Sequence, residues 1–255
     1  MPGFSALKHR SSLFALVAAL ESSAAARAAQ VEVEASLEAG AVAASRNDVR
    51  IPGSGGTQLS LSDELSSPVA PAFRVRAGVR LHERHLITAL YAPLQLEARG
   101  SVGRELAFAG ETFAAGTPLY AVYRFDSYRL TYRYSFVRDE RWELAAGFTG
   151  KIRDAEVSLY GDGAARKTNT GFVPLLNLHA EWRPGGGAWG VLLDADALAA
   201  PQGRAEDVLL AATWAVRPDV VLRLGYRMLE GGADNDEVFS FAWLHYAVLG
   251  VDLTF

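Results

Sequence analysis

The side chains best suited to acid–base chemistry are histidines, and four of the five in the chain follow residue 28. His179 is the most interesting, because Glu181 lies two positions away and Asp194 and Asp196 lie on the next predicted strand. A histidine beside a carboxylate can serve as a general base. No serine or cysteine accompanies His179 as a nucleophile, so the sequence favours a histidine held in a network of charges over a catalytic pair.

The other histidines give weaker signals. His82 and His85 flank a short turn, where side chains are ordinarily hydrated. His245 lies in the C-terminal segment, and only this histidine, with Ser240 nearby, can be nominated for a hydrolytic site. We assign no catalytic residue from the sequence.

Composition argues against several other classes. The chain has no cysteine, which excludes a disulfide framework, a thiolate metal site and a cysteine nucleophile. It shows neither a glycine-rich phosphate loop nor histidines at metal-ligand spacing, so we expect no cofactor and no metal. The formal charge of −4 gives no reason to expect nucleic acid as a partner.

The C-terminal segment 241–255 has the pattern of a strand with two different faces. Its apolar residues occupy every second position, namely Ala247, Leu249, Val251, Leu253 and Phe255. A strand that ends on an aromatic residue resembles the last strand of small bacterial outer-membrane β-barrel proteins. The resemblance implies that Leu249, Val251, Leu253 and Phe255 form the signal read by the barrel-assembly machinery, and it implies an export signal and an even number of strands.

Residues 1–28 have the features of a secretory signal peptide. Basic residues 8–10 precede the apolar run 13–20, and Ala26-Arg-Ala28 has the small-x-small form of a cleavage site. The run is too short to cross a bilayer as a helix, and no later stretch approaches the roughly 18 apolar residues that a membrane helix needs. An exported chain that meets a membrane must then cross it with strands, and a closed barrel leaves no unpaired edge in lipid.

The remaining chain, 29–255, reads as one barrel domain of ten strands. Long loops at 44–71, 99–118 and 155–171 alternate with short turns at 82–84, 138–141, 184–187 and 217–219. This alternation resembles the outer-membrane class, which implies short turns and both termini on the periplasmic side. Within the second loop, Leu106, Phe108 and Phe113 predict a small hairpin; Pro93 predicts a kink, and a slip in the alternation near Asp154 predicts a bulge.

Aromatic residues near the short turns place the apolar face outside, as an interfacial girdle: Tyr134, Phe136, Trp142, Trp182, Trp189, Trp214 and Phe255. The polar face then lines the lumen with nine bases (Arg74, Arg76, Arg80, Arg129, Arg133, Lys151, Arg183, Arg223, Arg227) and nine acids (Glu32, Glu34, Glu38, Glu97, Glu143, Glu181, Asp194, Asp196, Asp252). Equal numbers imply pairing, because an isolated buried ion is very costly. We expect the three glutamates of the first strand to pair with the three arginines of the second.

Three families of enzymes use barrels of this kind, and none supplies a match by residues. Omptin proteases have ten strands but need paired aspartates and an Asp–His couple at the outer rim, which the sequence does not show. The lipid A palmitoyltransferase begins with an amphipathic helix, for which the first strand leaves no room. Lipid A deacylases use a histidine-based site facing the bilayer, for which only His245 with Ser240 can be nominated.

The sequence therefore predicts a single ten-stranded antiparallel transmembrane up-and-down β-barrel with a polar lumen and an apolar exterior. Ten strands with large charged side chains inside leave at best a narrow polar path. We expect a non-enzymatic outer-membrane protein, either structural or a narrow porin-like channel for small solutes, with extracellular contact loops. The alternative is an enzyme acting on lipid A or phospholipid at the outer rim. The expected partners are the lipid bilayer, lipopolysaccharide and the barrel-assembly machinery.

Overall fold

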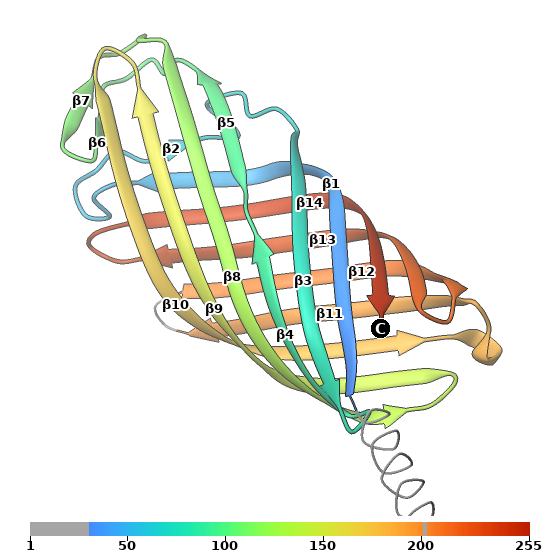
Figure 1. Ribbon diagram of the computed structural model, residues 1–255. Helices are drawn as coiled ribbons and strands as arrows, with labels where there is room; N and C mark the ends of the chain where they lie inside the picture. The colour runs from blue at the N-terminus through green and yellow to red at the C-terminus, as the bar shows by residue number, and fades with distance from the viewer. Residues whose placement is uncertain (1–30, 201–202) are drawn as a thin grey trace, which may run out of the picture.

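The computed structural model describes residues 31–200 and 203–255 (Figure 1), so the predicted signal peptide, 1–28, lies outside the described residues. The strands are β1 (Val31–Arg50), β2 (Leu59–Ser60), β3 (Ala70–Leu81), β4 (His85–Ala92), β5 (Gln95–Gly100), β6 (Leu106–Phe108), β7 (Glu111–Phe113), β8 (Leu119–Arg138), β9 (Trp142–Tyr160), β10 (Ala164–Trp182), β11 (Trp189–Ala200), β12 (Gly203–Arg217), β13 (Val220–Asp234) and β14 (Phe239–Thr254). A single 3₁₀ turn, Pro184–Gly186, joins β10 to β11. In the described part of the chain, no helix has the length and apolar character needed to cross a membrane.

The strands close into a ten-stranded antiparallel barrel, which confirms the predicted fold. Closure comes from β1 and β14, which pair from Glu34 opposite Thr254 to Arg50 opposite Phe239. The pieces β4 and β5 act as one strand beside β8, interrupted around Pro93 as predicted. Proline has no N–H to donate to the ladder, which accounts for the interruption.

One of the expected loops is mostly strand, and a second is partly strand. The segment 155–171 continues β9 and β10, which stay paired up to Tyr160 opposite Ala164, and β1 runs on to Arg50 within the expected loop 44–71. The sequence pattern missed these extensions because strand residues outside the membrane need not alternate between apolar and polar. The bulge predicted near Asp154 is also wrong: the register is continuous there and shifts instead between Ala44 and Arg46, Ser135 and Val137, and Ala215 and Arg217.

The outer face of the barrel is apolar and ends in aromatic side chains. At one end Trp142 stacks on Trp182, and Trp189 stacks on Trp214. Phe172 lies ten residues along β10 from Trp182 and is 70% exposed. At about 3.4 Å per residue and a tilt of about 40°, ten residues rise about 26 Å along the axis, close to the ~25 Å height of an apolar membrane band. Phe172 therefore marks the opposite edge of this band.

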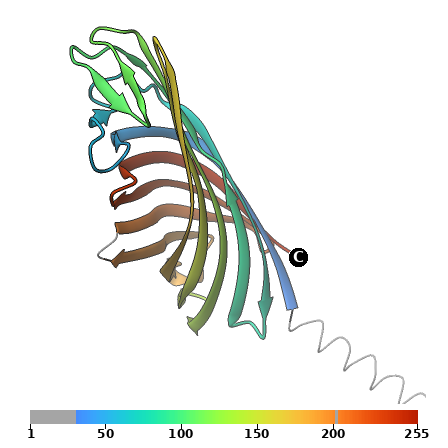
Figure 2. The same ribbon diagram turned by 90° about the vertical axis from the view of Figure 1, so that its left-hand side faces the viewer.

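The opposite end is covered by a folded cap, which we define as residues 51–69 and 101–118. In Figures 1 and 2 its strand β2 and hairpin β6–β7 lie beside the outer ends of the long strands β8, β9 and β10. The hairpin was predicted, and it turns at Gly110, whose φ of +90° favours glycine. The two halves are joined by hydrogen bonds from Thr57 N to Ala107 O (2.8 Å) and from Ala109 N to Ile51 O (2.7 Å).

The cap has an apolar core and an ion pair at its surface. Its buried side chains are Ile51, Leu59, Leu61, Leu65, Val102, Leu106, Phe108 and Phe113. A hydrogen bond from Arg104 lowers the pKa of Glu64 below its ordinary value. Because that pKa is lowered, the pair stabilises the cap at neutral pH, and its contribution is lost as the pH falls through the lowered pKa.

We predict that Phe113→Ala loosens the cap without unfolding the barrel. Phe113 is fully buried, and truncating a buried phenylalanine to alanine typically costs about 3–5 kcal/mol. Limited proteolysis should cut the variant faster within 101–118, whereas the folded barrel should keep its heat-modifiable migration on gels. Phe136→Ala, on the exposed outer face, is the matched control. Equal cleavage of the two variants would contradict a cap with its own core.

Candidate functional site

A layer of buried charges crosses the lumen around Asp207 of β12. The Asp207 carboxylate accepts hydrogen bonds from three guanidinium groups: those of Arg74 (2.9 and 3.0 Å), Arg129 (2.6 Å) and Arg227 (2.5 Å). All four residues are buried. Because Arg74 belongs to β3 and Arg129 to β8, these bonds join one side of the barrel to β12 on the other.

Two further acids complete the charge balance of this layer. Glu38 accepts two bonds from Arg227 (2.8 and 2.9 Å), and Asp196 accepts one from Arg129 (2.8 Å). Asp196 also accepts hydrogen bonds from Thr149 (2.7 Å) and Asn177 (2.8 Å). We call the set Glu38, Arg74, Arg129, Asp196, Asp207 and Arg227 the ionic layer. Its three acids balance its three bases, and each acid accepts a hydrogen bond from at least one of these arginines, as buried ions require.

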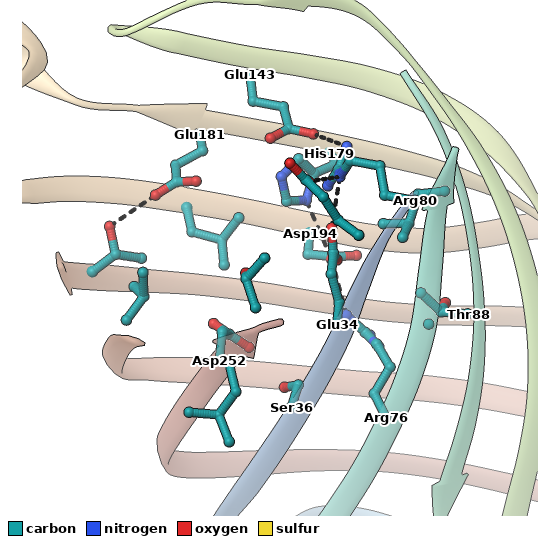
Figure 3. Close-up of a pocket in the computed structure, with 18 of the residues that line it drawn as sticks. Glu34, Ser36, Arg76, Arg80, Thr88, Glu143, His179, Glu181, Asp194 and Asp252 are labelled. Atoms are coloured by element: carbon teal, nitrogen blue, oxygen red, sulfur yellow. Dashed lines mark hydrogen bonds and ion pairs between the residues drawn. The ribbon is translucent and has the colours of Figure 1, made fainter. Parts of the chain in front are cut away.

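Between the ionic layer and the short-turn end of the barrel lies a polar cavity of about 310 Å³, here called the vestibule (Figure 3). Arg133 is its organising residue, because its guanidinium donates to Asn177 Oδ1 (2.8 Å), His179 Nδ1 (2.8 Å) and Asp194 Oδ2 (2.9 Å). Arg76 reaches the same oxygen of Asp194 at 3.5 Å. Asp194 is thus held by two guanidinium groups.

The contacts of His179 argue against a catalytic His–Asp couple. Its Nδ1 lies 2.8 Å from Arg133 Nη1 and 3.4 Å from Asp194 Oδ2. A guanidinium can only donate, so Nδ1 accepts from Arg133 and has no proton to give to Asp194. An orienting carboxylate in a catalytic triad must accept from Nδ1. His179 therefore belongs to the charge network, as the sequence favoured.

The mouth of the vestibule is also paired. Arg80 binds Glu34 (2.6 Å) and Glu143 (3.0 Å) and lies 3.8 Å from Glu32. Figure 3 shows Glu143 and Asp194 from one side of the lumen approaching Arg80 and Arg76 from the other. Further pairs join Glu181 to Arg183 (2.9 Å), Asp252 to Arg223 (2.7 Å) and Glu32 to Arg138 (3.3 Å). Each of these carboxylates thus has a guanidinium partner.

The structure brings most of the predicted lumen residues into the ionic layer or the vestibule: Glu32, Glu34, Glu38, Arg74, Arg76, Arg80, Arg129, Arg133, Glu143, His179, Glu181, Asp194, Asp196, Arg223, Arg227 and Asp252. The expected pairing between the first two strands is only partly present. Arg80 does bind Glu34, but Arg74 and Arg76 reach across the lumen to Asp207 and Asp194. Register alone does not reveal this, because Arg74 lies directly opposite Glu38.

The lumenal assignment of Glu97 is wrong. Its side chain is 43% exposed, whereas its neighbours Leu96 and Ala98 are buried inside. The same reversal holds along β4, where Leu86 and Leu90 face inward and Ile87 faces outward. Both faces of this strand are apolar, so the sequence offers only this one acid as an indication of the lumenal face. At the position of Glu97 along the barrel axis, an acidic side chain on the outer face can contact water.

Sequence reasoning missed Asp207, the centre of the ionic layer. The predicted strand was read only from Leu210 onward. Extending its alternation backward from the outward residues Trp214, Ala212 and Leu210 would have placed Asp207 on the inward face. The alternation therefore does predict that Asp207 faces the lumen, but only when the strand is extended N-terminal to Leu210.

His245 faces outward as expected, but its predicted partner is wrong. Ser240 has the opposite parity and lines a cavity inside the barrel. Instead, His245 Nε2 lies 2.7 Å from Ser45 Oγ, and His245 Nδ1 lies 2.5 Å from Tyr226 Oη. Ser45 is the extra residue of the bulge in β1 between Ala44 and Arg46. A bulge changes the direction in which nearby side chains point. Here it places the Ser45 hydroxyl beside His245.

Comparison with known proteins gives a fold but no family. No family model and no curated protein matches this chain. Among solved structures, the outer membrane protease OmpT from Escherichia coli aligns over 88% of this chain and 97% of its own with a TM-score of 0.53 and 9% identity. The attachment invasion locus protein Ail of Yersinia pestis aligns over 88% and 99% with a TM-score of 0.41 and 10% identity. Neisserial surface protein A aligns over 88% and 97% with a TM-score of 0.33 and 15% identity.

The likeness in fold to OmpT, together with the closed ten-stranded barrel, confirms the predicted resemblance to bacterial outer-membrane β-barrel proteins. At 9% identity the likeness to OmpT concerns the fold alone.

We predict that Asp207→Ala is strongly destabilising. The substitution removes the carboxylate to which three buried guanidinium groups donate hydrogen bonds. Removing one member of a buried ion network typically costs about 3–5 kcal/mol. Urea unfolding in lipid vesicles measures this loss. Asp219→Ala is the control, because it breaks an exposed pair with Arg217 and should leave the free energy of unfolding almost unchanged. Similar unfolding curves for the two variants would show that the ionic layer contributes little.

Proposed function

We propose that this chain is a non-enzymatic barrel of the bacterial outer membrane, with a closed lumen and an extracellular cap that makes surface contacts. The observation that carries the proposal is the ionic layer. Its carboxylates and guanidinium groups bind one another across the lumen, so none is left to conduct an ion. Among the described residues, the vestibule and the cavity on the far side of the layer share no lining residue.

The outer face supports placement in a membrane. Its exposed residues include Leu130 (61%), Phe148 (67%) and Leu224 (64%). An apolar surface that encircles a barrel needs hydrocarbon to cover it. We infer that residues 1–28 direct export, that both ends of the barrel chain lie in the periplasm, and that lipopolysaccharide surrounds the cap side.

The closing strand supports the proposed assembly signal. Phe255 is 74% exposed, and its backbone exchanges hydrogen bonds with Val33 (2.9 and 3.2 Å) at the seam between β14 and β1. Leu249 is 63% exposed on the same outer face. Leu249, Val251, Leu253 and Phe255 therefore offer an apolar edge that the assembly machinery can bind before the seam closes.

We predict that the purified protein gives no single-channel conductance in planar bilayers, and that the double variant Arg74→Ser with Asp207→Ser does. The double substitution removes one charge of each sign, so it opens space in the ionic layer without leaving a net charge. Arg217→Ser with Asp219→Ser, at an exposed turn, is the matched control and should stay silent. Conductance by the unaltered protein equal to that of the Arg74/Asp207 variant would refute a lumen closed by these residues.

The contacts of His245 favour one second candidate, an enzyme that cleaves an ester of lipid A or of a phospholipid at the outer rim. Its Nε2 lies within hydrogen-bond reach of the Ser45 hydroxyl, which is the arrangement of a base and a nucleophile. The serine oxygen would attack the ester carbonyl while its proton passes to His245 and then to the departing alcohol, and water would release the acyl group from Ser45. Tyr226 Oη contacts His245 Nδ1, the atom that a carboxylate usually contacts to orient the histidine of a catalytic triad.

Mass spectrometry of lipid A and phospholipids from expressing cells separates the two candidates. Under the non-enzymatic proposal, we predict that the unaltered chain leaves both lipid classes unchanged. Loss of an acyl chain that disappears with Ser45→Ala and with His245→Ala, but persists with the inward-facing Ser240→Ala, would instead establish the hydrolase.

A further inference from the structure

The wall of the barrel splits between β10 and β11. Their ladder runs from Trp182 opposite Val191 to Leu176 opposite Ala197 and ends there. Beyond it, the rest of β10 pairs with β9, and the end of β11 pairs with β12. Pro174, two residues before the last pair, cannot donate a ladder hydrogen bond. In Figure 1 the outer half of β10 rises with β9, whereas β11 and β12 end well below it.

A cavity of about 410 Å³ opens at this split, and we call it the side cavity. Its lining includes both edges of the split, Val173 and Pro174 on β10 and Leu198 on β11. Phe172 also lines it, and this side chain is 70% exposed on the outer face of the wall. The side cavity therefore reaches from the lumen to the membrane-facing surface.

The height of the split fits contact with the outer leaflet. Phe172 marks the outer edge of the apolar band, about 26 Å from the periplasmic girdle by the strand geometry above. Unpaired backbone groups are costly in hydrocarbon but can be satisfied near headgroups and water. A split at this height is thus tolerable, and it gives access to molecules that lie in the outer leaflet.

The side cavity carries positive charge that the protein does not neutralise. Lys151 is buried, and its ammonium lies 4.8 Å from the centroid of the Phe125 ring. Its cross-strand neighbour is Arg129, whose guanidinium is already bound to Asp196 and Asp207. Arg153, two residues on, donates through Nη2 to Asn169 Oδ1, but its buried Nε has no hydrogen-bond partner. Within the described residues, neither Lys151 nor Arg153 forms an ion pair, whereas the third base, Arg204, pairs with Glu230.

A buried ammonium without a partner is unfavourable and tends to lose its proton, unless a ligand supplies the opposite charge and keeps the ammonium form. The rest of the lining is largely apolar, including Tyr123, Phe125, Leu198, Leu229 and Ala242. At about 410 Å³ the side cavity lies near the lower end of the roughly 300–1,000 Å³ typical of small-molecule sites. That size favours one alkyl chain with a small head over a lipid with two chains.

We propose that the side cavity binds a long-chain fatty acid, which enters sideways from the outer leaflet through the split between β10 and β11. The chain lies against Phe172, Val173 and Leu198, and the carboxylate binds Lys151 with Arg153 beside it. The ionic layer separates this binding site from the vestibule, so binding does not require a lumen that is open from end to end.

The test is direct binding of a fluorescent long-chain fatty acid to the full-length mature protein in lipid nanodiscs. We expect saturable binding that unlabelled fatty acid displaces. A fatty alcohol of the same length and acetate should fail to displace it, because each lacks one of the two features that the site recognises. Stronger displacement by a lysophospholipid than by the fatty acid would overturn the choice of a carboxylate, and absence of saturable binding would overturn the site.

Two pairs of variants locate the site. Lys151→Met should weaken binding about tenfold or more, since hydrogen bonds to charged groups contribute about 1.5–3 kcal/mol; Lys167→Met, on the exposed part of β10, is its control. Val173→Trp should fill the split and abolish binding, whereas Val216→Trp on the lipid-facing wall should not. Arg153→Met serves as a second charge variant if Lys151→Met fails to fold. Unchanged affinity in the folded variants of the side cavity would refute the proposal.

Discussion

The constraint on which this structure depends is that ions inside a narrow barrel must neutralise one another. The lumen of ten strands is too small to hydrate eight or more guanidinium groups separately, and burying an unpaired ion costs several kcal/mol even after relaxation. Arginine meets this constraint because its planar fork can bind two carboxylates at once. Arg129 joins Asp196 to Asp207, Arg227 joins Glu38 to Asp207, and Arg80 joins Glu34 to Glu143.

The same constraint explains why lysine is absent from the ionic layer. A lysine ammonium is a compact, strongly hydrated charge that does not present a fork. Lys151 is the one buried lysine among the described residues, and it lies outside the paired network against the ring of Phe125. The position of Lys151 therefore differs in kind from that of the lumen arginines, and the structure gives it no acid of its own.

The fold was predictable from sequence because its signals are local. Alternation along each strand, short turns at one end and the terminal Phe255 sufficed to predict ten strands and closure between the first and last. Partners across the lumen were not predictable, because they depend on the tilt and stagger of strands far apart in sequence, as for Arg74 and Asp207. The Ser45–His245 contact was hidden for a related reason: it requires a bulge, whose position the alternation did not reveal.

The strands extend to different heights along the barrel axis, and this difference accounts for both the cap and the side cavity. The hairpins of β8, β9 and β10 are tall and carry the cap, whereas the hairpin of β11 and β12 is short and leaves β10 with one neighbour at its outer end (Figure 2). Tyr123, Leu229 and Ala242 line the side cavity and belong to the same buried apolar cluster as Phe113 of the cap. Lys151 lies between that cluster and the ionic layer, in the cavity beside the split in the wall. The proposed fatty acid would then approach this lysine through the split, from the lipid side.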